Sequence, residues 1–284
     1  MKIREKIDSE RIVNISGYRF VELEDRDLLR QPFLLTCKGL KLKGTILLST
    51  NGINFSLAGE QDAINVYIDF LYSDTRFAGI PLKITYSDYQ PFRRMLVRLK
   101  KEIISLGMDE IRPLEFTGPN IKPSEFKKIL DNSNEVIVLD TRNEYETRVG
   151  LFENAIDLKL DSFRDFPKAI LDLPEEYKAK QIVMYCTGGI RCEKASAVML
   201  KAGFKNVKKL EGGILGYFEE TDGSHWKGDC FVFDNRVAVD TELNETEHSM
   251  CFSCREPLTK QEVNSLDYKL NSYCPYCVDR NSEE

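Results

Sequence analysis

Residues 182–195 read IVMYCTGGIRCEKA, and this stretch decides the fold. The apolar run 182–185 is typical of a buried strand, and a helical pattern begins again at Cys192. Cys186 therefore stands at the carboxyl end of a strand, where the loops of an open parallel sheet form a crevice. A strand, a short loop with two glycines and a helix in immediate succession predict an α/β unit with a cysteine at its reactive edge.

The loop after this cysteine has the composition of an anion-binding site. Its residues are Thr187, Gly188, Gly189, Ile190 and Arg191. Two adjacent glycines let the backbone curl so that its amide hydrogens converge on one point. The positive end of the following helix points the same way, and the arginine adds a full charge. We expect these features to lower the pKa of Cys186 and stabilise its thiolate; a buried structural cysteine is the alternative.

The sequence around this loop alternates between strands and helices. Apolar strands are predicted at 136–140, 155–158, 182–186 and 206–210, and helices at 124–130, 161–170, 192–202 and 214–220. Continuous apolar strands separated by helices indicate a parallel sheet covered on both faces. Residues 124–225 are therefore predicted to form one α/β domain. A further strand is predicted at 231–233.

The N-terminal third has a different pattern. Strands are predicted at 18–23, 44–49, 53–58 and 82–86, and helices at 25–40 and 61–72. The β-α-β-β-α-β order predicts a ferredoxin-like α+β sandwich over residues 1–102. The Asn51-Gly52 dipeptide suits a tight hairpin with positive φ at both central residues. Residues 103–123, with Pro113, Gly118-Pro119 and Pro123, are predicted to form a linker.

The C-terminal segment, residues 226–284, is rich in cysteine. Two C-x-x-C pairs, separated by 19 residues, lie within its last 34 residues: Cys251, Cys254, Cys274 and Cys277. Two such knuckles at this spacing predict tetrahedral zinc with no position left for water, which is a structural site. Four free thiols or incidental disulfides are the alternative.

The net charge of −6 argues against nucleic acid, but the charge is unevenly distributed. Residues 226–284 hold 6 basic and 12 acidic residues, so the acidity lies in the tail. A basic cluster closes the N-terminal third and could contact phosphates: Arg93, Arg94, Arg98, Lys100 and Lys101. A solvated strand or helix face is the simpler interpretation of these charges. The chain has neither an apolar run long enough to span a bilayer nor a signal-peptide pattern, so it is expected to be cytoplasmic.

The Cys-x4-Arg loop after a strand resembles the active loop of rhodanese domains, which handle sulfur. The related dual-specificity phosphatases have one residue more in this loop. Residues 139–146, which contain Asp140 and Arg142, resemble the rhodanese motif after its first core strand, and Glu211-Gly212-Gly213 with Tyr217 resembles its closing motif. The resemblance implies that Asp140 and Arg142 orient the loop; a simple buried ion pair is the alternative.

A narrower resemblance covers nearly the whole chain. The loop CTGGIRCEKA is similar to that of the rhodanese-containing family of oxygen-dependent tRNA uridine hydroxylases. Residues 44–47, 52–54, 98–103 and 230–236 and the two terminal cysteine pairs also resemble that family. One position departs from the family pattern, because Asn51 stands where an acidic residue usually precedes Gly-Ile-Asn.

The resemblance implies hydroxylation of the wobble uridine, position 34, in the anticodon loop of tRNA, with molecular oxygen as co-substrate. The Cys186 thiolate could add to C6 of uracil and make C5 electron-rich, or it could carry an oxidised sulfur. Cys192 could act as a resolving thiol or could simply pack inside. No flavin, haem or nucleotide motif is apparent in the sequence.

Two other functions use the same loop. A sulfurtransferase would carry sulfur as a Cys186 persulfide, and only the flanking blocks of sequence favour the hydroxylase over it. A non-catalytic rhodanese fold could also dock a partner. Cys186 and Arg191 argue against this last interpretation, because pure docking needs neither side chain.

Overall fold

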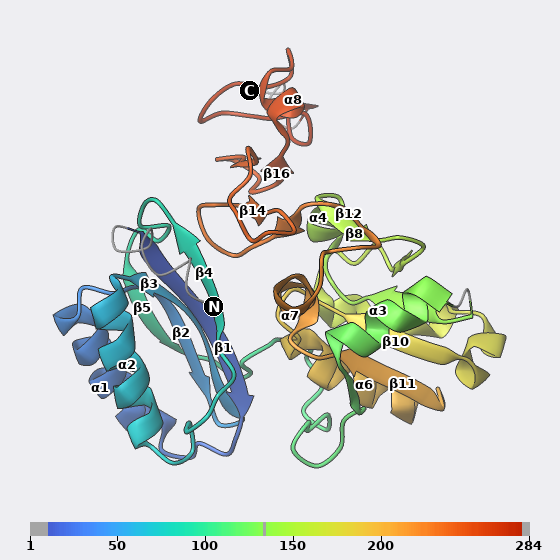
Figure 1. Ribbon diagram of the computed structural model, residues 1–284, viewed down its shortest axis with the longest axis horizontal. Coiled ribbons are helices and arrows are strands. Elements are labelled where there is room, and N and C mark those ends of the chain that lie inside the picture. Colours follow the sequence, from blue (N-terminus) through green and yellow to red (C-terminus); the bar gives the residue numbers. More distant parts are fainter. Residues whose placement is uncertain (1–10, 133–134, 280–284) are drawn as a thin grey trace.

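The computed structural model describes residues 11–132 and 135–279. Figure 1 shows an N-terminal domain, a second domain built on a parallel sheet, and a tail that lies above both. Within the described ranges, no helix has the length and apolar character needed to cross a bilayer.

The N-terminal domain is a five-stranded sheet with two helices on one face. Its elements are β1 (Ile12–Phe20), α1 (Arg26–Gly39), β2 (Lys43–Ser49), β3 (Gly52–Gly59), α2 (Gln61–Ser73), β4 (Lys83–Ser87) and β5 (Met95–Leu99). The strand order is β4-β1-β3-β2-β5, and all neighbours are antiparallel except β2 and β5. The first four strands and two helices confirm the predicted ferredoxin-like sandwich.

The two faces of this sheet differ in chemistry because side chains alternate along each strand. Val13 and Ile15 of β1 join the core under α1 and α2. Ser16 lies opposite Ser56 of β3 in the pairing register and lines a pocket on the other face. This second face carries no helix and is turned toward the second domain (Figure 1). We call it the open face.

Two details of the N-terminal domain differ from the prediction. The sequence pattern ended at β4, whereas β5 adds an edge strand parallel to β2. The β2–β3 hairpin has Thr50 and Asn51 as its central residues, since Ser49 pairs with Gly52. Gly52 has a φ of +142°, and a Cβ there would lie 2.1 Å from the Arg19 carbonyl oxygen, so this glycine permits the close approach of β1.

The second domain has a five-stranded parallel sheet of order β6-β11-β10-β7-β9. Its elements are β6 (Asn120–Ile121), α3 (Pro123–Asn132), β7 (Ile137–Asp140), α4 (Glu144–Thr147), β8 (Gly150–Phe152), β9 (Ile156–Asp157), α5 (Phe166–Ala169), β10 (Gln181–Tyr185), α6 (Ile190–Lys201), β11 (Asn206–Leu210) and α7 (Gly213–Glu220). Separate apolar cores lie on its two faces. The prediction of a parallel sheet covered on both faces is confirmed.

Two segments of this domain differ from expectation. The single helix predicted over 161–170 is a 3-10 turn (Phe163–Asp165), the short α5 and another 3-10 turn (Ile170–Asp172). Pro167 lies in the first turn of α5 and cannot donate to a preceding turn. The segment predicted as a linker, 103–123, is packed rather than free: β6 pairs with β11, and Leu106 and Ile111 are buried in the core that contains α6.

The tail begins against the second domain and then contacts the first. Its elements are β12 (Trp226–Gly228), β13 (Cys230–Phe231), β14 (Ala238–Val239), β15 (Ser249–Met250), β16 (Pro257–Leu258) and α8 (Lys260–Val263). β13 accounts for the first residue of the strand predicted at 231–233. The Asn235 amide donates to the Pro91 carbonyl at 3.0 Å, and the Arg236 guanidinium donates to Thr85 Oγ1 at 2.8 Å. These bonds fix the β13–β14 loop against the open face.

Candidate active site

Cys186 lies immediately after β10, at the carboxyl edge of the parallel sheet. Its side chain is 1% exposed. The Gly189 amide donates a hydrogen bond to Cys186 Sγ at 3.1 Å. Gly189 has a φ of +95°, a backbone conformation that favours glycine, and it precedes the first residue of α6. The Gly189 amide of the loop and the Arg191 and Cys192 amides at the start of α6 therefore point toward the sulfur.

The start of α7 holds the other side of the loop. The amides of Ile214 and Leu215 donate to the carbonyls of Cys186 and Thr187 at 3.0 and 3.1 Å. A Cβ on Gly213 would lie 2.3 Å from the Cys186 carbonyl oxygen. Only glycine permits this approach, which gives the Glu211-Gly212-Gly213 motif a physical role.

Arg191 is held by a residue that the sequence reasoning did not assign to the site. Its two terminal nitrogens donate to the Glu146 carboxylate at 2.5 and 2.6 Å, and both side chains are buried. Thr187 Oγ1 donates to the same carboxylate at 3.4 Å. Burial raises the pKa of Glu146, but the charge of Arg191 and its hydrogen bonds lower it more, so the carboxylate is charged. Glu146 thus fixes the arginine that closes the loop.

The environment of Cys186 favours the thiolate. Burial raises the pKa of its thiol, but a hydrogen bond from the Cys192 thiol and the charge of Arg191 lower it more, and the result is about 6. The pKa of Cys192 is raised, because the thiol is buried and lies against the Cys186 sulfur. Cys192 also lies 3.6 Å from Thr141 Oγ1. Of the two thiols, Cys186 is therefore the one that is deprotonated, and Cys192 stays protonated.

This pKa predicts a pH titration. The lowered value means that thiolate is present above pH 6 and is lost as the pH falls through about 6. We expect the difference in ultraviolet thiolate absorbance between wild type and Cys186→Ser to have its midpoint near pH 6. A midpoint near 9, the ordinary value for a thiol, would contradict this description of the loop.

The N-terminal domain covers the loop. Tyr18 of β1 donates from its hydroxyl to Glu193 on the first turn of α6 at 3.2 Å. Lys209 also pairs with Glu193, at 2.5 Å. Burial, Glu193 and Cys186 all raise the pKa of Tyr18, so its hydroxyl remains protonated. This contact contributes to the low exposure of Cys186.

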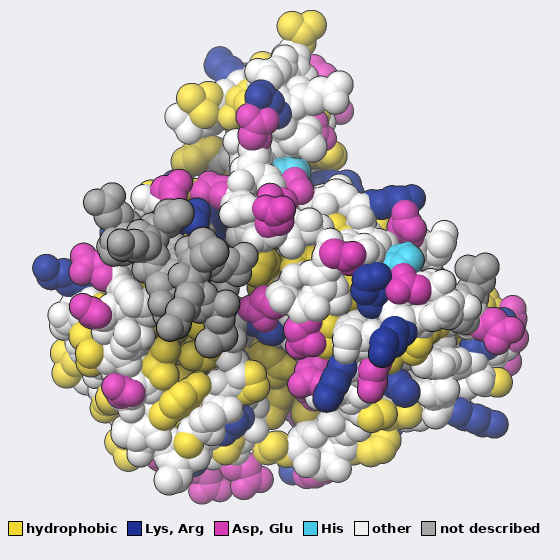
Figure 2. All heavy atoms as spheres, viewed as in Figure 1, with side chains coloured by type: hydrophobic (Ala, Val, Ile, Leu, Met, Phe, Trp, Pro, Cys, Tyr) yellow, Lys and Arg dark blue, Asp and Glu magenta, His cyan; other side chains and the backbone are white. Residues whose placement is uncertain are grey.

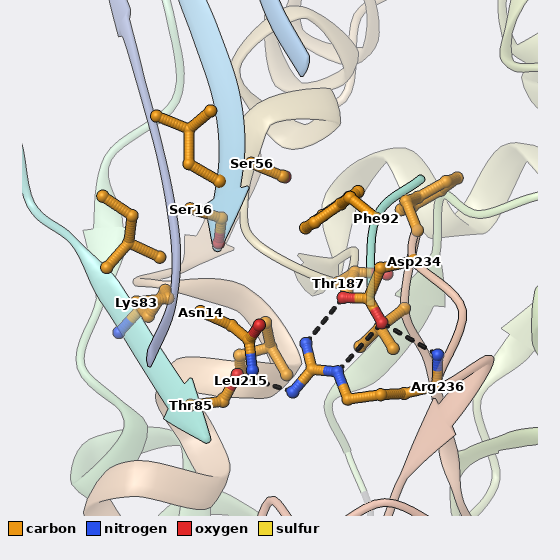
Figure 3. Close-up of a pocket in the computed structure, with 14 residues that line it drawn as sticks. Asn14, Ser16, Ser56, Lys83, Thr85, Phe92, Thr187, Leu215, Asp234 and Arg236 are labelled. Atoms are coloured by element: carbon orange, nitrogen blue, oxygen red, sulfur yellow. Dashed lines mark hydrogen bonds and ion pairs between the residues drawn. The ribbon is translucent and has the colours of Figure 1, made fainter. Parts of the chain in front are cut away.

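A pocket lies between the open face and the loop (Figure 3). From the N-terminal domain it is lined by residues of β1, β3 and β4 and by Phe92; from the second domain by Thr187 and Leu215; and from the tail by residues 232–234 and Arg236. Three parts of the chain that are distant in sequence therefore meet beside Cys186.

Comparisons with known proteins agree with this architecture. The UPF0176 acylphosphatase like domain matches residues 12–103, and the rhodanese-like domain matches residues 122–220. A tRNA uridine(34) hydroxylase of Cupriavidus necator is 47% identical over 94% of this chain and 96% of its own length. Another, of Ralstonia nicotianae, is 46% identical over 94% of this chain and 97% of its own.

The chain belongs to the tRNA uridine(34) hydroxylase family. The resemblance recognised from the loop and its flanking blocks is confirmed. Among solved structures, a rhodanese-like domain from Anabaena sp. is 21% identical over 39% of this chain and 80% of its own, with a TM-score of 0.32.

In this member of the tRNA uridine(34) hydroxylase family, Asp140 and Arg142 form a buried ion pair. Arg142 Nη2 lies 2.6 Å from Asp140 Oδ2, and both side chains are 0% exposed. Arg142 also donates to the Gly150 carbonyl at 2.6 Å, and its guanidinium lies 5.3 Å from the centre of the Trp226 ring. A bond from Arg142 to the Glu146 carbonyl, 3.4 Å long, connects this pair to the residue that holds Arg191.

The predicted RNA-binding residues lie outside the pocket. All five are exposed and lie at or beside β5, the edge strand next to β2: Arg93 and Arg94 precede it, Arg98 lies within it, and Lys100 and Lys101 follow it. The pocket instead meets β4, β1 and β3. On the face shown in Figure 2, basic and acidic side chains are interspersed over the second domain. The basic cluster is thus a local feature of one sheet edge.

Asn51, the residue that departs from the family pattern, stabilises a turn. Its amide N–H donates to Ser49 Oγ at 3.1 Å, and its side-chain oxygen accepts from the Ile103 amide at 3.4 Å. Asn54 donates to the Ile103 carbonyl at 3.1 Å. These side chains attach the start of the 103–123 segment to the hairpin.

The four terminal cysteines are brought together, as their spacing predicted. All four sulfurs lie within 4.8 Å of one another. The pairs Cys251–Cys277, Cys254–Cys274 and Cys274–Cys277 are separated by 3.9, 3.5 and 3.8 Å. Four thiolates around zinc, each about 2.3 Å from the ion, lie about 3.8 Å apart. The cluster can hold a metal ion, and its geometry fits tetrahedral thiolate coordination.

Proposed function

We propose that this chain hydroxylates uridine 34 of tRNA at C5, using the Cys186 thiolate and molecular oxygen. The observation that carries the proposal is the 47% identity to a tRNA uridine(34) hydroxylase over 94% of this chain. A buried thiol with a pKa of about 6 supplies the nucleophile that such chemistry on a pyrimidine needs. tRNA as substrate implies a cytoplasmic enzyme.

In this proposal each residue of the loop has a role. Cys186 is the reactive group, and the amides of Thr187, Gly188, Gly189 and Ile190 with the charge of Arg191 stabilise its anion. Glu146 positions Arg191, and the Asp140–Arg142 pair supports Glu146. We assign the loop to a catalytic domain of residues 124–225, preceded by the ferredoxin-like domain of residues 1–102.

In this proposal Cys192, together with Cys186, supplies the two electrons that the reduction of oxygen requires. Placing one oxygen atom of O2 in the C5–H bond and releasing the other as water consumes two electrons and two protons. Oxidation of Cys186 and Cys192 to a disulfide releases the same number, and an external thiol then reduces the disulfide. Mass spectrometry after a single turnover should detect a Cys186–Cys192 linkage; a product formed without it would remove Cys192 from the reaction.

The test of the proposed function is nucleoside mass spectrometry of tRNA from cells lacking this protein. We expect 5-hydroxyuridine and its derivatives to be missing and to return with the wild-type gene. If they persist and a thiolated nucleoside disappears instead, the chain is a sulfurtransferase that carries a Cys186 persulfide. Formation of thiocyanate and sulfite from thiosulfate and cyanide by the purified protein would support that outcome.

We propose that the basic edge of β5 contacts the phosphates near the tRNA anticodon loop. Lys101 pairs with Asp109 at 2.8 Å, whereas Arg93, Arg94 and Arg98 are exposed and free of side-chain ion pairs within the described ranges. Changing these three arginines to glutamate should weaken tRNA binding at least about tenfold and flatten its salt dependence. A matched triple change of exposed residues on the second domain, Lys168, Lys180 and Lys205 to glutamate, is the control. Equal effects of the two variants in a filter-binding titration would contradict a specific RNA surface.

We propose that the metal held by the four terminal cysteines is a structural zinc ion. The purified protein should contain about one zinc per chain. Cys254→Ser should abolish retention of the metal and expose residues 251–277 to protease, while β10 and the Cys186 loop stay protected. Full protection of the tail after removal of the metal with a chelator would show that this segment folds without it.

A further inference from the structure

A small pocket lies beside the Cys186 loop. Its volume is about 70 Å³, which is room for about five water molecules. Its floor and walls come from the open face, from Thr187 and from the β13–β14 loop (Figure 3). Thr187 directly follows the reactive cysteine, so a flat ring in this pocket lies against the active loop.

Phe233 is the feature that points to a base. Its side chain is 57% exposed, although Val232 beside it is buried. Its ring meets that of Phe231 edge-to-face, with centroids 5.1 Å apart and an angle of 88°. The guanidinium of Arg191 lies 5.8 Å from the centre of the Phe233 ring. An exposed ring that its neighbours hold in one orientation, next to the loop, is a platform on which an unpaired base can stack.

The opposite wall offers two hydroxyl groups for hydrogen bonding. Ser16 of β1 and Ser56 of β3 are direct cross-strand partners, and both line the pocket. Among the described residues, neither hydroxyl has a hydrogen-bond partner. Arg236 and Thr85, by contrast, are already bonded to each other. A hydroxyl can donate or accept, so this pair suits the edge of uracil, where an N–H lies between two carbonyl oxygens.

We propose that this pocket receives the base of the modified nucleotide, with Phe233 stacking on the ring and the Ser16–Ser56 pair bonding its edge. The proposal rests on the function proposed above and adds the residues that hold the uracil. A base in a single-stranded loop can leave its stack with a small loss of free energy, and stacking on Phe233 compensates for that loss. Phe233 and the two serines are binding residues and take no part in proton or electron transfer.

The experiment is a double-mutant cycle between the protein and the RNA. Binding of an anticodon stem-loop with uridine at position 34 is compared with binding of the same RNA abasic at that position. The proteins are wild type, Phe233→Leu, Phe233→Trp, the double variant Ser16→Ala/Ser56→Ala and a control, Phe116→Leu, which changes an exposed phenylalanine of the 103–123 segment. Retained protection of the Cys186 loop from protease shows that each variant is folded.

We expect wild type and Phe116→Leu to bind the base-containing RNA about tenfold more tightly than the abasic RNA. Phe233→Leu should lose most of that preference while binding the abasic RNA as wild type does, and the serine variant should lose part of it. Phe233→Trp should retain the preference, and the fluorescence of its added indole should be quenched by the base-containing RNA only.

Two results would overturn the pocket assignment. One is a wild-type protein that binds both RNAs equally; the other is a Phe233→Leu variant that loses affinity for both RNAs to the same extent. The proposed reaction can fail separately. The protein could show a base preference that depends on Phe233 and yet form no 5-hydroxyuridine. That result would support the pocket assignment and contradict the proposed hydroxylation.

Discussion

Cys186→Ser is expected to lower the rate of 5-hydroxyuridine formation by at least about a thousandfold. The serine hydroxyl can still accept the hydrogen bond from the Gly189 amide, so the loop should keep its shape. What is lost is the charge, because a hydroxyl stays protonated at pH 7, whereas the Cys186 thiol has a pKa of about 6. The measurement is the initial rate on purified tRNA under air.

The matched control for this variant is Cys192→Ser. It changes the second sulfur of the pair and leaves the reactive one in place. If the two thiols supply the electrons, Cys192→Ser should act on tRNA only when an external thiol is added, whereas Cys186→Ser should not respond to that thiol. A Cys186→Ser protein that works within tenfold of wild type would rule out thiolate chemistry at this loop.

Asp140→Asn should destabilise the second domain by about 3–5 kcal/mol, the second large effect that we expect. The change leaves the guanidinium of Arg142 buried without its countercharge, among side chains that exclude water. The sole tryptophan of the chain, Trp226, lies 5.3 Å from that guanidinium. Its fluorescence during urea unfolding therefore reports on this domain separately from the N-terminal sandwich.

Asp109→Asn provides the control for Asp140→Asn. It also removes one carboxylate from an ion pair, here with Lys101, but both partners are exposed. Solvent screens such a pair, so the urea midpoint should not move measurably. If Asp140→Asn also leaves the midpoint unchanged, the buried pair contributes little, and the Gly150 and Glu146 carbonyls and the aromatic neighbours are sufficient for Arg142.

Local sequence was sufficient to predict the loop and much of both sheets. The strand end, the two glycines and Arg191 lie within six residues of Cys186, so their relation is set by the chain itself. The terminal cysteines were equally predictable, because the ligand spacing of a knuckle is fixed by local geometry. The predicted first residues of α3 and α7 also lie close to the observed ones.

Contacts between distant residues were not predictable. Glu146 lies 45 residues from Arg191, and nothing in its local sequence indicates which arginine it binds. Tyr18 and Glu193 are separated by 175 residues, so the covering of the loop by the N-terminal domain had no sequence signal. β5 was missed although four of its five residues are apolar. This edge strand gains its order from pairing with β2, a contact that its own sequence does not indicate.

Phe233 shows where composition alone misleads. In the sequence it belonged to an apolar triplet, 231–233, that predicted a strand. The strand β13 ends at Phe231, and the next residues turn so that Phe233 faces outward. Its position could have been suspected only from Asp234-Asn235 directly after it, a pair of residues that favours turns.

The pocket beside Cys186 also has a consequence for synthesis of the protein. Its walls include Ser16, Thr187 and Arg236, and the last of these is held to β4 through Thr85. A ribosome makes these residues in order, so the first sandwich and the parallel sheet can fold while the β13–β14 loop is still inside the exit tunnel. During that interval the nascent chain already contains the Cys186 thiol with its lowered pKa, but the wall of the pocket that carries Phe233 is not yet in place. Full assembly of the site is therefore delayed until the tail emerges, and a chain released early would contain an oxidisable cysteine beside an incomplete pocket.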